Sequence, residues 1–136
     1  MNKLIFAIAL GSMMLIGACT KQDCNIVDVE YGEYFTIKPC GKYCFPDDNY
    51  FEVKNLINGF CPCFWNCFWA GEMYLIFHAN MDGVTLDTTI GSSELTNKVF
   101  VKAPYTMHFK DIEFEEVCSN SNPSPKIVSA SVMVSK

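Results

Sequence analysis

Three cysteines and four aromatic residues fall within eleven positions, residues 61–71, and this segment constrains the chain more than any other. It reads Cys-Pro-Cys-Phe-Trp-Asn-Cys-Phe-Trp-Ala-Gly and is followed by a strongly β-like segment. Disulfides between such closely spaced cysteines would hold the loop rigid. A rigid loop rich in aromatic side chains is typical of a recognition surface rather than of a reaction centre.

The N-terminus has the pattern of a bacterial lipoprotein signal. Lys3 precedes an apolar run over residues 4–16, which is too short for a spanning helix. The run ends in Leu-Ile-Gly-Ala-Cys, in which small residues precede Cys19 as in a lipobox. We therefore expect residues 1–18 to be a signal peptide, Cys19 to carry acyl chains, and residues 19–24 to form a lipidated tether. The alternative is an ordinary signal peptide with a structural Cys19.

The same segment predicts an outer-membrane location. Two or three acyl chains anchor a protein far more firmly than one. Thr20, rather than Asp, follows Cys19, and this is compatible with outer-membrane sorting by a rule that resembles the proteobacterial one. The cell surface and the periplasmic face are both open alternatives.

The remainder, residues 25–136, has the length of a single domain with one core. Without Lys3, nine lysines oppose fifteen acidic residues, and the chain contains no arginine. An acidic surface without arginine argues against a nucleic-acid partner, because phosphate recognition depends on clusters of Lys and Arg. It also argues against binding to anionic lipid beyond the acyl anchor.

The other cysteines predict disulfides, because an exported chain meets an oxidising compartment. Once the lipidated cysteine is set aside, an odd number remains, so one is unpaired or paired between chains. These seven are Cys24, Cys40, Cys44, Cys61, Cys63, Cys67 and Cys118. Cys24 with Cys118 would tie the two ends of the domain. Cys40 with Cys44 would pair locally and leave Cys63 odd; alternatively, Cys63 pairs with Cys40 or Cys44.

Short apolar runs alternate with turn signals along the domain, and no segment keeps a period of 3.6 residues. This pattern predicts an all-β fold, a small antiparallel barrel or sandwich of about eight strands stapled by disulfides. We favour the barrel, because most neighbouring strands are joined by short turns. Residues 39–49 are expected to form a loop, and residues 80–83 a hairpin turn. The predicted strands are 25–30, 33–38, 50–57, 68–80, 84–89, 98–102, 105–117 and 126–135.

Residues 61–71, with the pattern Cys-Pro-x4-Cys-x-Trp-Ala-Gly, resemble the signature of a group of small secreted and lipid-anchored bacterial proteins, especially from Bacteroidota. In that group Asp-Ser-Arg precedes the pattern, whereas this chain has Asn58-Gly59-Phe60 and an inserted Cys63. The resemblance implies a Cys61–Cys67 disulfide, which the chain-entropy estimate values at ~2.4 kcal/mol. The group is largely without an assigned function, so the resemblance informs the fold more than the activity.

The aromatic residues of the loop have two interpretations. We expect Trp69 to pack in the core beside the disulfide. The others cannot all be interior if the loop lies at the rim of the domain, and exposed aromatic clusters mark binding surfaces. The equally weighted alternative is a small core beneath the loop. The candidate binding loop, residues 60–68, contains Phe60, Cys63, Phe64, Trp65, Asn66 and Phe68.

No motif predicts catalysis, a metal or a cofactor: a phosphate loop, a zinc-protease motif and a nucleophile elbow are all lacking. The cysteines lack the usual zinc spacing, and the compartment favours their oxidation. Cys63 would need a base as a nucleophile, but His78 and His108 lie in strand patterns. We interpret residues 47–49 as a turn rather than a calcium site, and residues 113–116 as a solvated strand end. The prediction is a protein that is not an enzyme.

A protein-binding module is the function that these features favour, most specifically a peptidase inhibitor that uses loop 60–68 as a wedge. A pinned loop loses little entropy on docking. In size, anchor and architecture, though not in motif, the chain is similar to the potempin inhibitors of oral Bacteroidota, which are small β-barrel lipoproteins of the outer membrane. The expected partner is a secreted peptidase. The alternatives are recognition of a host protein, glycan or envelope partner through Trp65 and the Phe cluster, and a purely structural lipoprotein.

Overall fold

The computed structural model describes residues 25–93, 103–115 and 118–136. Within these ranges the chain is all-β, with eight strands in two sheets. The expected signal peptide, the expected tether with Cys19 and Cys24, and the strand expected at 98–102 lie outside the described residues. No helix in the described ranges is long and apolar enough to cross a bilayer.

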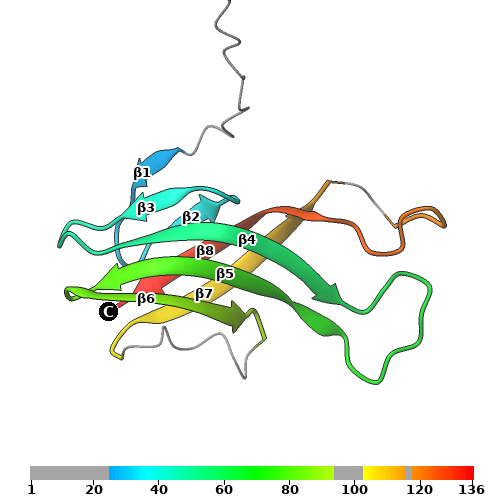
Figure 1. Ribbon diagram of the computed structural model, residues 1–136. Coiled ribbons are helices and arrows are strands. Elements are labelled where there is room, and N and C mark those ends of the chain that lie inside the picture. The colour runs from blue at the N-terminus through cyan, green and yellow to red at the C-terminus, as the bar shows by residue number, and fades with distance from the viewer. Residues whose placement is uncertain (1–24, 94–102, 116–117) are drawn as a thin grey trace, which may run out of the picture.

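The larger sheet has five strands and the smaller sheet has three, and they face one another (Figure 1). The larger sheet has the order β1-β3-β4-β5-β6, with β1 (Ile26–Asp28), β3 (Lys42–Cys44), β4 (Tyr50–Phe60), β5 (Gly71–Met81) and β6 (Val84–Gly91). The smaller sheet has the order β2-β8-β7, with β2 (Tyr34–Ile37), β8 (Ile127–Ser135) and β7 (Thr106–Phe114).

The all-β prediction is confirmed as a sandwich, and the preference for a closed barrel is wrong. The chain changes sheets between β1 and β2, where Gly32 turns with a positive φ of 80°. Two separate ladders therefore form in place of one continuous sheet. The pairing is antiparallel except between β1 and β3, which run parallel. The prediction of a loop over residues 39–49 is also wrong in part. Tyr43 is buried, and its strand β3 pairs with β4 in the larger sheet.

The core lies between the two sheets and follows the two-residue period of the strands. On β5, five side chains point inward and are fully buried, while their neighbours face outward. They are Met73, Leu75, Phe77, Ala79 and Met81. Phe51 on β4 lies at the centre of an aromatic group, 5.1 Å from the ring of Tyr43 and 6.1 Å from that of Phe77. Burial of each large side chain contributes about 1.5–3 kcal/mol.

Buried polar groups close the end of the sandwich at which β4 begins and β5 ends. The side-chain amide of Asn49 donates to the hydroxyls of Tyr105 (2.8 Å) and Tyr31 (3.0 Å). Its oxygen accepts the backbone N–H of Asp82 at 2.7 Å, and Tyr105 donates to the Asp82 carboxylate at 2.7 Å. Because Asn49 is only 2 % exposed, these bonds replace water in satisfying its amide.

Asp47 and Lys136 complete this network on its solvent side. Asp47 accepts hydrogen bonds from the hydroxyl of Tyr31 (2.8 Å) and from the ammonium of Lys136 (2.9 Å). We call Tyr31, Asp47, Asn49, Asp82, Tyr105 and Lys136 the polar clasp. Residues 46–48 form a turn, as the sequence predicts, and the carboxylate of Asp47 accepts a hydrogen bond within the polar clasp.

Candidate functional site

The loop between β4 and β5, residues 61–70, extends from the opposite end of the sandwich (Figure 1). The two strands pair as far as Phe60 and Gly71, and the N–H of Cys61 then donates to the carbonyl of Ala70 at 2.8 Å. Gly71 has a positive φ of 80°, and a Cβ there would collide with the carbonyl oxygen of Gly59. Glycine at this position therefore lets the two ends of the loop approach closely.

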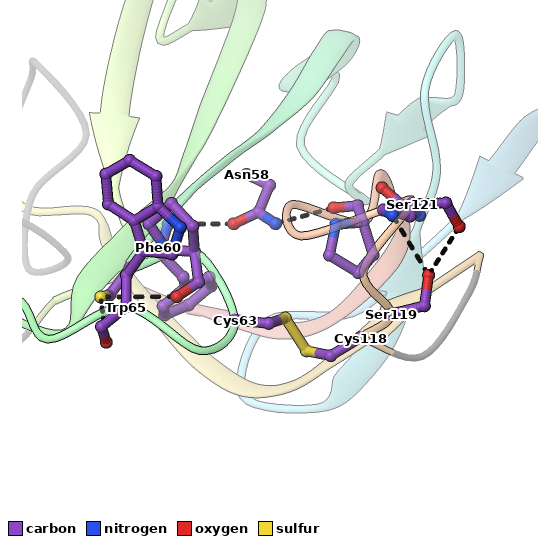
Figure 2. The surroundings of a disulfide bond; sticks show 11 residues. Asn58, Phe60, Cys63, Trp65, Cys118, Ser119 and Ser121 are labelled. Atoms are coloured by element: carbon purple, nitrogen blue, oxygen red, sulfur yellow. Dashed lines mark hydrogen bonds between the residues drawn. A yellow bond between two sulfur atoms is a disulfide. The ribbon is translucent and has the colours of Figure 1, made fainter.

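Two interleaved disulfides hold the loop. Cys61 pairs with Cys67 inside it, and Cys63 pairs with Cys118 in the segment between β7 and β8 (Figure 2). The Cα atoms of the two pairs lie 6.0 and 5.7 Å apart, which is usual for disulfides. The N–H of Cys63 also donates to the carbonyl of Pro123 at 2.7 Å. The loop is therefore fastened to the strands that precede and follow it and to the other sheet.

The Cys61–Cys67 pairing that the family resemblance implies is present. The expected Cys24–Cys118 pair is wrong, and so are both alternatives for Cys63, as the odd cysteine and as the partner of Cys40 or Cys44. The ends of the two sheets converge here and bring Cys63 against Cys118.

The expected Cys40–Cys44 pair is also wrong. Cys44 is a free thiol, whereas Cys40 is disulfide-bonded, although not to Cys44. The extended strand β3 carries Cys44 away from the turn that contains Cys40.

The aromatic side chains of the loop are mostly in solvent. Phe64, Trp65 and Phe68 expose 75 %, 69 % and 114 % of their reference surface. Trp69 is 56 % exposed, so the prediction that it packs in the core is wrong. The reason is that β5 begins at Gly71, not at residue 68, and Trp69 therefore belongs to the loop rather than to an inward strand face. Asn66 is exposed as well.

A tight turn sets the direction of the exposed rings. The N–H of Trp65 donates to the carbonyl of Pro62 at 3.2 Å. Phe64, the third residue of this turn, has a positive φ of 68°, which costs a residue with a Cβ about 1–2 kcal/mol. Disulfides at Cys61 and Cys63 hold the turn in this strained conformation. Strain that its surroundings enforce points to a functional constraint on the loop.

Phe60 behaves differently from the exposed rings and lies in a groove beneath the loop. Its ring is partly buried and contacts Phe114 edge to face at 6.2 Å. The groove has a volume of about 720 Å³, within the range of small-ligand sites. Its lining consists of Asn58, Phe60, Cys61, Cys63, Phe114, Glu115, Cys118, Pro123 and Pro125.

Asn58 fixes one wall of the groove. Its side-chain N–H donates to the carbonyl of Pro125 at 2.7 Å, and its side-chain oxygen accepts the N–H of Phe60 at 2.9 Å (Figure 2). The end of β4 is thereby joined to the segment that precedes β8. Sequence reasoning missed the groove, because its walls are separated by more than 50 positions and no local pattern links them.

Of the residues considered for catalysis, Cys63 lies in this site, whereas His78 and His108 lie on strands β5 and β7. Cys63 is in a disulfide and offers no thiolate. His78 lies on β5, where its Nδ1 is 2.8 Å from a carboxylate oxygen of Asp87. His108 lies on β7, with its Nε2 3.3 Å from the hydroxyl of Ser135. Both histidines are strand-face residues.

The acidic residues at the end of β7 have different surroundings. The Ser129 hydroxyl donates to Glu113 at 2.6 Å, whereas Glu115 lines the groove, and Glu116 lies outside the described residues. In the part of the chain that the structure describes, no three His, Cys, Asp or Glu side chains gather as a metal site.

Comparisons with protein-family models, with curated proteins and with solved structures find no match for this chain. The resemblance of residues 61–71 to the Bacteroidota group therefore stays a prediction. The candidate site consists of the exposed aromatic loop and the groove beneath it.

Proposed function

We propose that the protein is a lipid-anchored, exported protein-binding module, and most specifically a peptidase inhibitor, whose loop 60–68 enters the partner. One observation carries this proposal. Phe64, Trp65 and Phe68 are exposed on a loop that two disulfides hold rigid. A soluble protein gains no stability by exposing large aromatic side chains together, and such clusters mark interfaces.

The exposed aromatic area is large enough for an interface. Phe, Tyr and Trp side chains each bury roughly 150–250 Å² when they are covered. The three rings together with Trp69 would therefore contribute roughly 600 Å² or more, close to the ~800 Å² that each partner buries in a standard complex. Residues 61–70 carry no charged side chain, so covering them leaves no unpaired charge at the centre of the interface.

The rigidity of the loop favours inhibition in particular. A flexible loop of this length would lose about 0.5–1.5 kcal/mol for each side chain that binding orders. Here the turn at residues 62–65 and both disulfides fix the loop before the partner arrives. A rigid projecting loop resists the rearrangement that hydrolysis would require and dissociates slowly. The partner is then a secreted peptidase.

The anchor is part of the same proposal. The lipobox at Cys19 precedes the first strand, β1, by only a few residues. Acylation there would place the sandwich at the outer membrane. Metabolic labelling with an alkyne-modified palmitate, compared between the natural chain and Cys19→Ser, tests this step. Equal labelling of the two chains would contradict it.

The binding step is tested by incubating the purified protein with a panel of serine, cysteine and metallo-peptidases. We expect inhibition of at least one peptidase and a complex on gel filtration. Trp65→Ala should abolish both, and Tyr34→Ala, which removes an exposed aromatic residue on β2, should leave both unchanged. Absence of inhibition and of any complex across the panel would refute the inhibitor role.

Recognition of a glycan is a second candidate, favoured by the exposure of both tryptophans, Trp65 and Trp69. Indole rings stack on the apolar faces of sugar rings. A glycan array probed with the natural chain and with Trp65→Ala distinguishes this candidate, because a glycan receptor would give specific signals that the variant loses.

A further inference from the structure

The groove beneath the loop has apolar walls. Phe60 from the end of β4 meets Phe114 from the end of β7, with their rings edge to face at 6.2 Å. The lining also includes Pro123 and Pro125, and the Cys63–Cys118 disulfide joins the loop to the segment between β7 and β8 (Figure 2). The volume of about 720 Å³ accommodates a long side chain with room to spare.

A single charged side chain borders this apolar space. Of the lining residues that the structure describes, only Glu115 carries a charge, and it is exposed. The amide of Asn58 already donates to Pro125 and accepts from Phe60. The backbone carbonyl of Lys126 accepts the N–H of Glu115, but Lys126 is not among the residues that line this groove and instead lines a separate pocket with Lys38.

We propose that this groove receives the side chain of a lysine presented by the protein partner that the aromatic loop binds. The proposal rests on the proposed function, because that function supplies the partner. The aliphatic stem of a lysine packs along phenylalanine rings and prolines, while its ammonium group remains at the rim. There it meets the carboxylate of Glu115 and the electron-rich ring faces. An acidic or carboxylate-bearing group would be repelled.

Two further observations agree with a basic occupant. The chain carries a net charge of −5, which favours approach of a basic surface. Cys61 and Cys63 form part of the groove wall, and the exposed Trp65 stands two positions after Cys63 in the same loop. A partner that covers Trp65 therefore lies close to the groove.

The test uses model compounds, so that no partner is needed. The ¹⁵N-labelled protein is titrated with N-acetyl-lysine methylamide and, in parallel, with N-acetyl-norleucine methylamide, which has the same stem without the charge. We expect the lysine probe to shift the amide signals of Phe60 and Phe114 and to bind about two- to fivefold more tightly than the norleucine probe. N-acetyl-glutamate methylamide should not bind.

The variants isolate the carboxylate. Glu115→Gln should remove the advantage of the lysine probe, whereas Glu113→Gln, which changes a neighbouring carboxylate that bonds to Ser129 outside the groove lining, should preserve it. Equal binding of the two probes, signal changes that map elsewhere, or an unchanged preference in Glu115→Gln would each overturn the inference. A negative result in the lysine titration would not affect the proposal that the loop binds a peptidase. A negative result in the peptidase panel alone would remove the proposed partner but leave the preference of the groove for a lysine side chain in place.

Discussion

Cys63 and Cys118 stand 55 positions apart in the sequence and are joined by a disulfide that connects the aromatic loop to the segment between β7 and β8. The loop is therefore tied to both sheets: directly to β4 and β5, and through this segment to the smaller sheet. Cys61–Cys67, separated by only six positions, closes a small ring within the loop. The first disulfide closes a long stretch of chain and the second a short one, so they should contribute differently to the free energy of unfolding.

Removing the long-range disulfide should cost more stability than removing the local one. The chain-entropy estimate gives about 4 kcal/mol for Cys63→Ser/Cys118→Ser and about 2.4 kcal/mol for Cys61→Ser/Cys67→Ser. Urea denaturation of the two double variants measures both values. A larger loss from the Cys61–Cys67 variant would contradict the expected order.

Gly71→Ala should destabilise the fold by at least about 2 kcal/mol. The residue has a left-handed backbone, and its new Cβ would also meet the carbonyl of Gly59 and force the strand ends apart. Gly83→Ala is the matched control, because Gly83 has a similar positive φ of 78° but open space around its Cβ position. The control should lose only the conformational part, about 1 kcal/mol. Thermal melting of the two variants shows whether the collision matters.

Asn49→Ala should lower the free energy of unfolding by about 2–3 kcal/mol, because it removes the amide that joins Tyr31, Tyr105 and Asp82 in a buried setting. Asn66→Ala, in the exposed part of the loop, should change it by less than about 0.5 kcal/mol. Equal effects of the two substitutions would show that the polar clasp does not stabilise the fold.

Stability should decline in alkali. Burial, together with the nearby Asp47, raises the pKa of Tyr31 above its usual value of 10.0, so the unfolded chain loses this proton first. Hydrogen bonds to Asp47 and Tyr105 raise the pKa of Lys136 from 10.5 to about 12. Both groups therefore contribute stability that is fully present below pH 10 and is lost as the pH rises through their folded-state pKa values.

Unfolding midpoints measured between pH 9 and 11 check this expectation, and Tyr31→Phe should flatten the decline. An unchanged slope in that variant would exclude Tyr31 as its source.

The pKa of Asp47 is lowered rather than raised, so its contribution to stability depends on pH in the opposite direction. Desolvation alone would raise its pKa, but hydrogen bonds from Lys136 and Tyr31 outweigh this and lower it. Its contribution is present above the unfolded value of 3.8 and is lost as the pH falls through the lower folded-state value. Asp47→Asn should therefore lose stability at neutral pH and show a weaker decline in acid than the natural chain.

The parts of the fold that local sequence controls were predictable. The two-residue turn at Asp82 and Gly83, both with positive φ, follows from a hairpin signal that is confined to four residues. A strand over most of β5 was predicted, at 68–80, from its run of apolar side chains. The Cys61–Cys67 ring was implied by the family motif.

The parts of the fold that depend on contacts between distant residues could not be predicted from local sequence. β3 exists because Tyr43 packs against Phe51, and its segment alone has the composition of a loop. Whether two ladders close into a barrel depends on where the chain changes sheets, which no local pattern records. The groove and the Cys63–Cys118 bond share this property, since both require the ends of β4 and β7 to converge.

The proposed recognition surface lies on an exposed turn between the disulfides, apart from the core that stabilises the fold. Phe64, Trp65 and Phe68 are exposed, and the loop is held by its disulfides and by the strand pairing that ends at Phe60 and Gly71. Substitutions at these three positions should therefore have little effect on folding, whatever they do to the proposed binding. The sandwich can therefore serve as a fixed frame on which a library of alternative loop sequences is displayed and selected for new targets.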